Sequence, residues 1–279
     1  TIPPNNGKQP DAAKSFLFDV SAPPSGAVLI IDLLSNSVVE LALAPTDILT
    51  DMDSRTTKLA LKLIPAGSFE MGDQTGRGDI DEDPVHIVNL SESFFIGIFE
   101  ITQAQWELVM GDTPSLFTAP GSDALPVEQV SFDDIQGFLS ILSSRIGRTV
   151  LLPTEAQWEY ACKAGTSTDW SFGNTANLAY QWTAGQSETP NVVGLKAPNL
   201  WGLYDMHGNV WEWCSDWYDK SYYSSAPLVD PENITPGAYR VYRGGGWTSS
   251  AHLCRSANRV RNLSTSRFPF LGFRCVAVR

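Results

Sequence analysis

Apolar residues recur at helical spacing in three parts of the chain. The clearest is about 131–146, whose apolar stripe consists of Ile135, Phe138, Leu139 and Leu142. Ser131 can cap this helix, and the two aspartates that follow suit the positive end of its dipole. Thr154 and Gly165 bound a second helix at about 154–163, and Thr102 begins a third at about 102–110.

A different pattern fills residues 15–63. Short apolar runs (SFLFDVSA, AVLIIDLL, VVELALA and KLALKLI) alternate with Pro, Gly and Asn, and the segment contains no Trp, Tyr or Cys. These runs predict strands, either of a small N-terminal β unit over 15–62 or of an extension to the sheet of the main domain. A helix over 46–63 is the alternative. Residues 1–14 are polar and Pro-rich, and we expect a flexible arm there.

From Leu63 onward the chain is rich in Trp and Gly, and all nine Trp and all eight Tyr lie beyond Gly72. Between Cys162 and Val241 neither the helical nor the strand period is sustained. Long irregular segments are uncommon in compact domains. A domain built this way needs staples such as a metal ion or disulfides, and the pattern as a whole predicts an α+β fold with little regular structure.

The composition excludes two broad classes of protein. With 43% hydrophobic residues in 279, the chain is too apolar for intrinsic disorder. No apolar run approaches the roughly 18 residues that a membrane helix needs. The chain starts at Thr1 without a signal-peptide pattern, so a membrane anchor is expected only upstream of it.

Charge is unevenly distributed along the sequence. After Glu232 there are eight arginines and no acidic residue, although the whole chain has a net charge of -12. A basic tail raises the question of nucleic acid, but these arginines are interleaved with core-type residues and contain no lysine among them. We therefore expect them to pair with acidic groups elsewhere in the fold, and we expect no nucleic-acid partner.

The four cysteines are Cys162, Cys214, Cys254 and Cys275. Their wide spacing and the absence of any CxxC disfavour a zinc site. An even count favours two disulfides in an oxidising compartment, with three possible connectivities. Four buried, reduced thiols are the alternative.

Seven segments, taken in order, resemble one known family. They are LIPAGSFEMGD (63–73), FFIGIFEITQAQW (94–106), PVEQVSFDDIQGF (126–138), LLPTEAQWEYAC (151–162), GLYDMHGNVWEWCSDWY (202–218), YRGGGW (242–247) and GFRC (272–275). Together they are similar to the formylglycine-generating enzyme (sulfatase-modifying factor) family. The resemblance covers 63–279 and implies a C-type-lectin-like fold, with residues 15–62 as a β extension.

The resemblance also implies metal ligands and disulfides. Position by position, the family's structural calcium ligands are the Asp205 and Glu212 side chains and the Gly208 and Val210 carbonyls. Mixed carboxylate and carbonyl oxygens from one loop suit calcium. The alternative is that Glu212 pairs with an arginine and Asp205 caps a turn. The family pairing joins Cys162 to Cys275, which leaves Cys214 for Cys254.

At the family's catalytic copper site the sequence departs from the pattern. The two positions that hold copper through cysteine thiolates correspond to Ser249 and Cys254. Thiolates suit Cu(I) because ligand and metal are both soft, whereas a hydroxyl is hard and protonated. We therefore expect no copper and doubt the oxidase activity.

The segment 244–275 resembles the variable region of retroelement-diversified proteins of the type of the Treponema variable protein. In such a region, segments typical of the family alternate with variable residues. The codons of these variable residues can arise from Asn codons by mutation at adenines. We define the candidate binding positions as Trp247, Thr248, Ser249, Ser250, His252, Leu253, Val260, Asn262, Leu263, Ser264, Thr265, Ser266, Phe268, Pro269 and Phe270. Small polar residues beside apolar anchors are typical of adaptable binding surfaces.

These observations favour a non-catalytic protein that binds a protein or host-surface ligand through this segment. We expect it outside the cytoplasm, secreted or on a bacterial cell surface. An oxidoreductase of the formylglycine-generating type with altered site chemistry is the alternative, and a purely structural module is a third hypothesis.

Overall fold

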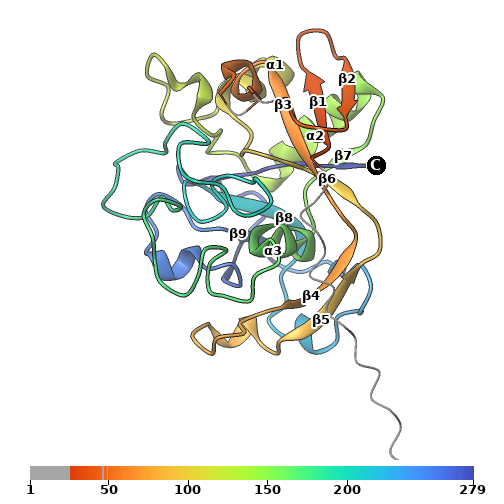
Figure 1. Cartoon of the computed structure of the whole chain (residues 1–279). Coiled ribbons are helices and arrows are strands. Elements are labelled where there is room, and N and C mark those ends of the chain that lie inside the picture. Colours follow the sequence, from red (N-terminus) through yellow and green to blue (C-terminus); the bar gives the residue numbers. More distant parts are fainter. Residues whose placement is uncertain (1–25, 46, 49) are drawn as a thin grey trace, which may run out of the picture.

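The protein is described here from a computed structural model, which covers residues 26–45, 47–48 and 50–279 (Figure 1). The expected arm, 1–14, and the first apolar run, 15–22, lie outside the described residues. No helix within the described ranges has the length and apolar character that crossing a membrane requires.

The three helices form where the sequence predicts them. They are α1 (Gln103–Met110), α2 (Phe132–Ile146) and α3 (Glu155–Lys163). Each starts after the predicted cap, because the Thr102, Ser131 and Thr154 hydroxyls accept a hydrogen bond from the backbone N–H three residues later. The third residue of each helix reaches back to the cap, which completes a capping box.

Twelve strands form three sheets in the described chain. The strands are β1 (Val28–Asp32), β2 (Val38–Leu41), β3 (Lys58–Ile64), β4 (Gly67–Met71), β5 (His86–Leu90), β6 (Phe94–Gly97), β7 (Val150–Leu151), β8 (Trp211–Trp217), β9 (Arg240–Arg243), β10 (Arg259–Asn262), β11 (Leu271–Gly272) and β12 (Val276–Val278). The largest sheet has the order β2-β1-β3-β6-β12-β7, the second β10-β9-β8-β11, and β4 pairs with β5 alone. The α+β class is confirmed.

The N-terminal strands extend the main sheet. β3 pairs antiparallel with β6, with Leu61 opposite Gly97 and Ile64 opposite Phe94. Residues 58–64 are therefore a strand, and of the alternative helix over 46–63 only the short 3₁₀ helix η1 (Met52–Arg55) forms among the described residues. The expected boundary between residues 62 and 63 falls inside β3.

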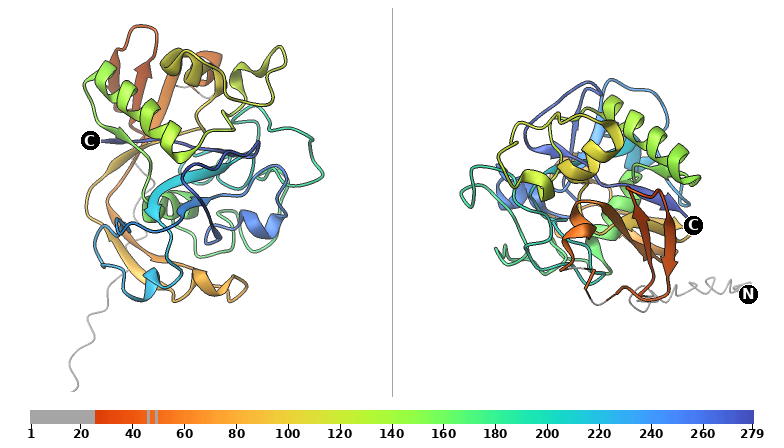
Figure 2. Two further views of the ribbon diagram at one scale, coloured as in Figure 1. Left: turned by 180° about the vertical axis from the view of Figure 1, so that it is seen from behind. Right: turned by 90° about the horizontal axis from the view of Figure 1, so that it is seen from above.

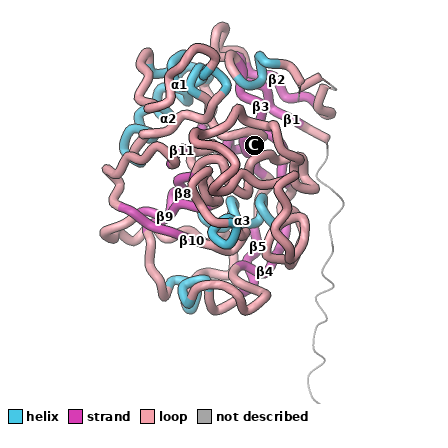
Figure 3. The backbone as a smooth tube through the Cα atoms, turned by 90° about the vertical axis from the view of Figure 1, so that its left-hand side faces the viewer, coloured by secondary structure: helices cyan, strands magenta, loops and turns pink. Residues whose placement is uncertain are grey.

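Between residues 164 and 210 the described chain contains no helix or strand, as its lack of periodicity suggests. Figure 3 shows how much of the molecule is loop, with short helical and strand segments set among it. The remaining 3₁₀ helices are η2 (Ile80–Glu82), η3 (Ser122–Ala124), η4 (Tyr222–Ser224) and η5 (Ala251–Cys254).

Two large apolar clusters fill the interior. One joins the main sheet to α1, α2 and the second sheet, and in it the rings of Trp106 and Phe138 stack with centroids 5.3 Å apart. The other surrounds α3 and includes Trp158 and Trp201. Figure 2 shows α2 lying along one side of the molecule. The loops of 164–210 and 244–275 are thus held against a rigid interior.

Candidate functional site

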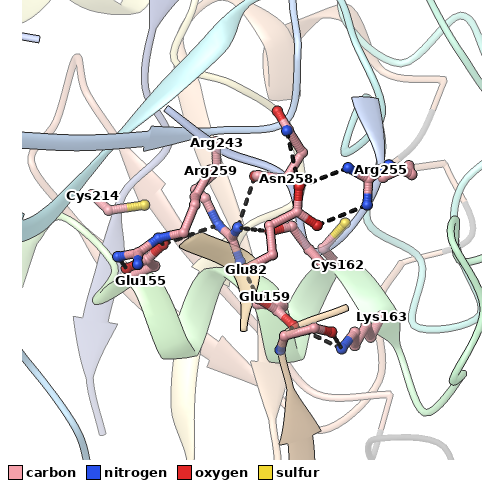
Figure 4. A network of polar contacts seen from close by, with 12 residues as sticks. Glu82, Glu155, Glu159, Cys162, Lys163, Cys214, Arg243, Arg255, Asn258 and Arg259 are labelled. Atoms are coloured by element: carbon pink, nitrogen blue, oxygen red, sulfur yellow. Dashed lines mark hydrogen bonds and ion pairs between the residues drawn. The ribbon is translucent and has the colours of Figure 1, made fainter. Parts of the chain in front are cut away.

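The arginines of the C-terminal part hold the loops in place through buried ion pairs (Figure 4). Arg255 contacts both oxygens of Glu82, at 2.7 and 2.6 Å, and Arg259 does the same with Glu155, at 2.8 and 2.6 Å. All four side chains are almost fully buried. The prediction that the arginines after Glu232 pair with acidic groups elsewhere in the fold is confirmed for five of the eight: Arg243, Arg255, Arg259, Arg267 and Arg274.

Arg243 connects this network to α3. Its guanidinium pairs with Glu159, which also accepts a 2.7 Å contact from Lys163. The same guanidinium donates to the carbonyl of Asn258 at 2.7 Å. Breaking a buried pair from one side leaves an uncompensated charge, so this network fixes the geometry of the C-terminal loops.

The candidate binding positions differ in exposure. Thr248, Ser250, His252, Leu263 and Thr265 are exposed. Those that are half-buried are Trp247, Leu253, Val260, Asn262, Ser264, Ser266, Phe268, Pro269 and Phe270. Ser249 is buried: its hydroxyl accepts from the backbone N–H of Gly246 at 3.0 Å. Ser249 is therefore a turn residue and no part of a contact surface.

One group of these positions gathers around Trp247. The indole N–H donates to the Pro269 carbonyl at 3.0 Å, and the rings of Phe268 and Phe270 stack 5.1 Å apart. A Cβ on Gly246 would lie 3.2 Å from Phe270, which explains why the chain has glycine at this close approach. The structure thus brings together the 247–253 loop and the 268–270 segment.

A second group lies at the start of α2. The Ser264 carbonyl accepts from the backbone N–H of Asp133 at 3.4 Å, and Arg267 forms a two-pronged pair with Asp134. The turn at 262–266 carries the exposed Leu263 and Thr265. No hydrogen bond, ion pair or ring contact joins this turn to the 248–252 loop among the described residues.

Two residues of the first group are not among the positions predicted from the sequence. The half-buried Phe117 packs edge-on against Trp247, with ring centroids 5.7 Å apart. The buried carboxylate of Glu128 positions it by accepting from the backbone N–H groups of Leu116, at 2.6 Å, and Phe117, at 3.1 Å. Burial raises the pKa of Glu128. The only signal for this pair in the sequence is Glu128 itself, an acidic residue within the segment PVEQVSF (126–132).

The geometry at the family's copper position does not fit copper. The Ser249 hydroxyl is committed to Gly246, and Cys254 is fully buried with its thiol 3.5 Å from the Ser250 carbonyl. Burial raises the pKa of Cys254 to about 12. With Ser249 at the other position, this site offers one sulfur and one hydroxyl in place of a thiolate pair.

The expected calcium ligands are all buried, but their donor atoms are largely in use. Glu212 forms a two-pronged pair with Arg274, at 2.6 and 2.8 Å, and accepts from the Trp158 indole at 2.8 Å. Asp205 accepts from the Gly194 N–H through Oδ2, while its Oδ1 is buried without a partner. Gly208 and Val210 are buried beside them. The pairing of Glu212 with an arginine, the alternative weighed above, is what this structure shows.

No three His, Cys, Asp or Glu side chains of the described residues are arranged to hold a metal ion. That result does not bear on the expected set of two carboxylates and two carbonyls. Both oxygens of Glu212 contact the guanidinium of Arg274, however, so this side chain does not fit the role of a calcium ligand in this arrangement.

The expected disulfides Cys162–Cys275 and Cys214–Cys254 are not formed, and all four thiols are free and buried. Cys162 and Cys275 lie in different apolar clusters. Cys162 instead faces the His207 ring at 3.8 Å, and His207 contacts the Cys254 carbonyl at 2.9 Å. Here the buried ion pairs supply the cross-links that the sequence analysis assigned to disulfides.

Comparison with known proteins places this architecture in a family. Residues 49–279 match the FGE-sulfatase family, "Sulfatase-modifying factor enzyme 1-like domain". The formylglycine-generating enzyme of Streptomyces coelicolor is 30% identical over 79% of this chain and 90% of its own length. Serine/threonine-protein kinase pkn1 of Chlamydia caviae is 34% identical over 76% of this chain, which spans only 37% of that protein.

Among solved structures, Treponema denticola variable protein 1 superposes with a TM-score of 0.72. It is 29% identical, and the match covers 80% of this chain and 96% of that one. The expected C-type-lectin-like fold of the formylglycine-generating type is confirmed. The chain belongs to the sulfatase-modifying factor enzyme 1-like domain family.

Proposed function

We propose that this protein is a non-catalytic, ligand-binding member of its family that presents a diversified C-terminal surface. The observation that carries the proposal is the arrangement around Trp247. Exposed short or flexible side chains, Thr248, Ser250 and His252, lie beside half-buried aromatic rings on loops that buried ion pairs fix. Rigid scaffolds with variable loop side chains are well suited to binding.

The copper position supports the absence of catalysis. A copper-thiolate oxidase of this family needs two cysteine sulfurs, and the chain offers a buried hydroxyl at Ser249 and only one thiol, that of Cys254. The similarity to Treponema denticola variable protein 1 supports the other half, because that protein is by name a variable protein on the same fold.

A pair of display libraries tests the binding surface. One library randomises the exposed positions Thr248, Ser250, His252, Leu263 and Thr265. The matched control randomises five exposed residues of the β1–β2 hairpin: Leu34, Ser35, Ser37, Val39 and Glu40. After selection on immobilised lysozyme, we expect binders from the first library only. Equal recovery from both would contradict a dedicated surface.

Diversification has its own test in the gene. We expect a near-identical second copy of the codons for 244–275 that differs from the first only at adenines, beside a reverse transcriptase gene. A chromosome without such a copy would leave binding possible but would refute diversification by this route.

An oxidoreductase of the formylglycine-generating type is the second candidate, favoured by the relative from Streptomyces coelicolor. Copper-loaded protein, dioxygen and a cysteine-containing sulfatase peptide decide between the two. We expect no loss of the peptide's thiol mass; formation of formylglycine would overturn the non-catalytic proposal.

The ligand we propose is a protein or host-surface molecule, met outside the cytoplasm. Protease treatment of intact cells tests the location. We expect the domain to be cleaved or shed there, and full protection in intact but not in lysed cells would contradict surface display.

A further inference from the structure

The loop that carries the family's calcium ligands is organised around an arginine. Arg274 follows β11 and is completely buried. Its Nε and Nη2 contact the two oxygens of Glu212, at 2.6 and 2.8 Å. The point of the loop where a cation would be expected is therefore next to a guanidinium.

The surroundings of Arg274 consist of oxygen atoms from three segments. Besides Glu212, Nη1 donates to the carbonyls of Gly97, at 2.9 Å, and Ile98, at 3.4 Å, and Nη2 donates to the carbonyl of Tyr204 at 2.9 Å. Every N–H of a guanidinium thus has an acceptor here. Carboxylate and carbonyl oxygens drawn from several segments are also what hard cations such as calcium take as ligands.

Three carboxyl groups surround this cradle, and Glu212 is the one in direct contact with Arg274. Burial raises the pKa of Glu100 well above its ordinary value and that of Asp205 to about 6, which leaves Glu212 as the carboxylate that most needs a cation beside it. Glu100 is itself held by Asn209 and the Val210 N–H, at 2.7 and 3.0 Å. Three buried carboxyl groups thus face one arginine, and Oδ1 of Asp205 has no hydrogen-bond partner.

We propose that the guanidinium of Arg274 is the built-in cation of the 205–212 loop, so that this fold is stable without calcium. Removing the guanidinium then leaves the buried Glu212 carboxylate without its charge partner, close to the Glu100 and Asp205 carboxyl groups, and we expect a divalent cation to compensate that charge once these side chains rearrange. The inference concerns the scaffold and does not depend on the proposed function.

Thermal unfolding of the wild-type protein tests the first half directly. We measure the melting temperature with excess EDTA, with excess calcium chloride and with neither, and we titrate calcium chloride calorimetrically. We expect the same melting temperature in all three and no binding heat. A melting temperature that falls in EDTA and recovers with calcium would overturn the proposal.

Arg274→Met tests the second half, because methionine keeps apolar volume and removes the charge. We expect a melting temperature lower by roughly 10 °C, which calcium chloride raises again in a dose-dependent way. The matched control is Arg267→Met, which removes a half-exposed partner of Asp134 and should respond to neither reagent. A folded Arg274→Met that ignores calcium would overturn this half.

If Arg274→Met does not fold, two results still decide. The wild-type measurements stand unchanged, and Arg274→Lys keeps a positive charge with fewer donors. We expect Arg274→Lys to fold, with a lowered melting temperature that calcium does not raise. A calcium-dependent rise in that variant would show that the cradle admits the ion despite a resident cation, and would refute the proposal.

Discussion

The clearest prediction separates the anchors of the C-terminal surface from its exposed positions. The perturbation is the triple variant Leu253→Ala, Phe268→Ala and Phe270→Ala. All three side chains are half-buried and pack against the cluster that joins the main sheet to α1 and α2. We expect this variant to lose much of its stability, although each residue belongs to the candidate binding positions.

The size of the effect follows from burial. Truncating a fully buried Phe to Ala costs about 3–5 kcal/mol, and a fully buried Leu about 2–5 kcal/mol. Half-burial suggests about half of each value, hence about 5 kcal/mol for the three together if the stacked pair Phe268 and Phe270 does not couple strongly. A loss of that size is a large part of the roughly 5–15 kcal/mol that stabilises a typical domain.

The assay is urea unfolding monitored by tryptophan fluorescence, and a second variant with substitutions to Ala at exposed positions serves as the control. The control replaces Leu263, which is 50% exposed, together with Thr265 by Ala. Exposed positions away from core and caps usually change stability by less than about 0.5 kcal/mol each. A triple variant as stable as the control would refute the reasoning and make the half-buried residues contact groups without an anchoring role.

Three further predictions concern buried polar groups. Burial lowers the pKa of His207 to about 4 from its ordinary 6.5, so its contribution to stability is complete above pH 6.5 and is lost as pH drops toward 4. Burial raises the pKa of Asp205 to about 6 and that of Asp216 to about 7, and these groups act in the opposite direction. The measurement is therefore the difference from His207→Asn in urea unfolding: between pH 7.5 and 4.5 the wild type should lose about 2–3 kcal/mol relative to the variant, and a constant difference would contradict this. Arg255→Met leaves the buried Glu82 without its ion-pair partner and should lower the free energy of unfolding by about 3–5 kcal/mol. Adding Glu82→Gln should restore more than half of that loss, and no recovery in the double variant would show that the two residues are not coupled. Glu128→Ala removes the acceptor of the Leu116 and Phe117 amides. Hydrogen exchange at these two amides should speed up at least tenfold, and the variant should lose about 1–3 kcal/mol of stability. Glu128→Gln keeps an acceptor and should keep most of the protection, so equal exchange rates in the two variants would contradict the assignment.

Local signals predicted local structure well. The caps at Thr102, Ser131 and Thr154 fixed the helix starts because an N-cap interaction involves residues only three positions apart. The run KLALKLI became β3. Four of the eight arginines after Glu232 found buried acidic partners, because a guanidinium in a core-type segment has few other ways to be satisfied.

Features that depend on contacts between distant residues were harder to predict. Phe117 meets Trp247 across 130 positions of sequence, and nothing in either segment specifies the other. The resemblance assigned disulfides and a calcium loop, yet the same positions hold free thiols and the Glu212–Arg274 pair. Ser249 was one of the candidate binding positions, yet it is buried and its hydroxyl accepts a hydrogen bond within its own turn.

The position of β12 has a consequence for synthesis on the ribosome. This three-residue strand lies between β6 and β7 and pairs with both, so it closes the main sheet. A nascent chain that has delivered only residues up to 275 still has β6 and β7 apart, each with an unpaired edge that invites pairing with another chain. The main sheet is complete only when residues 276–278 emerge from the ribosome. Until then the domain exposes these strand edges, so its solubility during synthesis depends on these three residues.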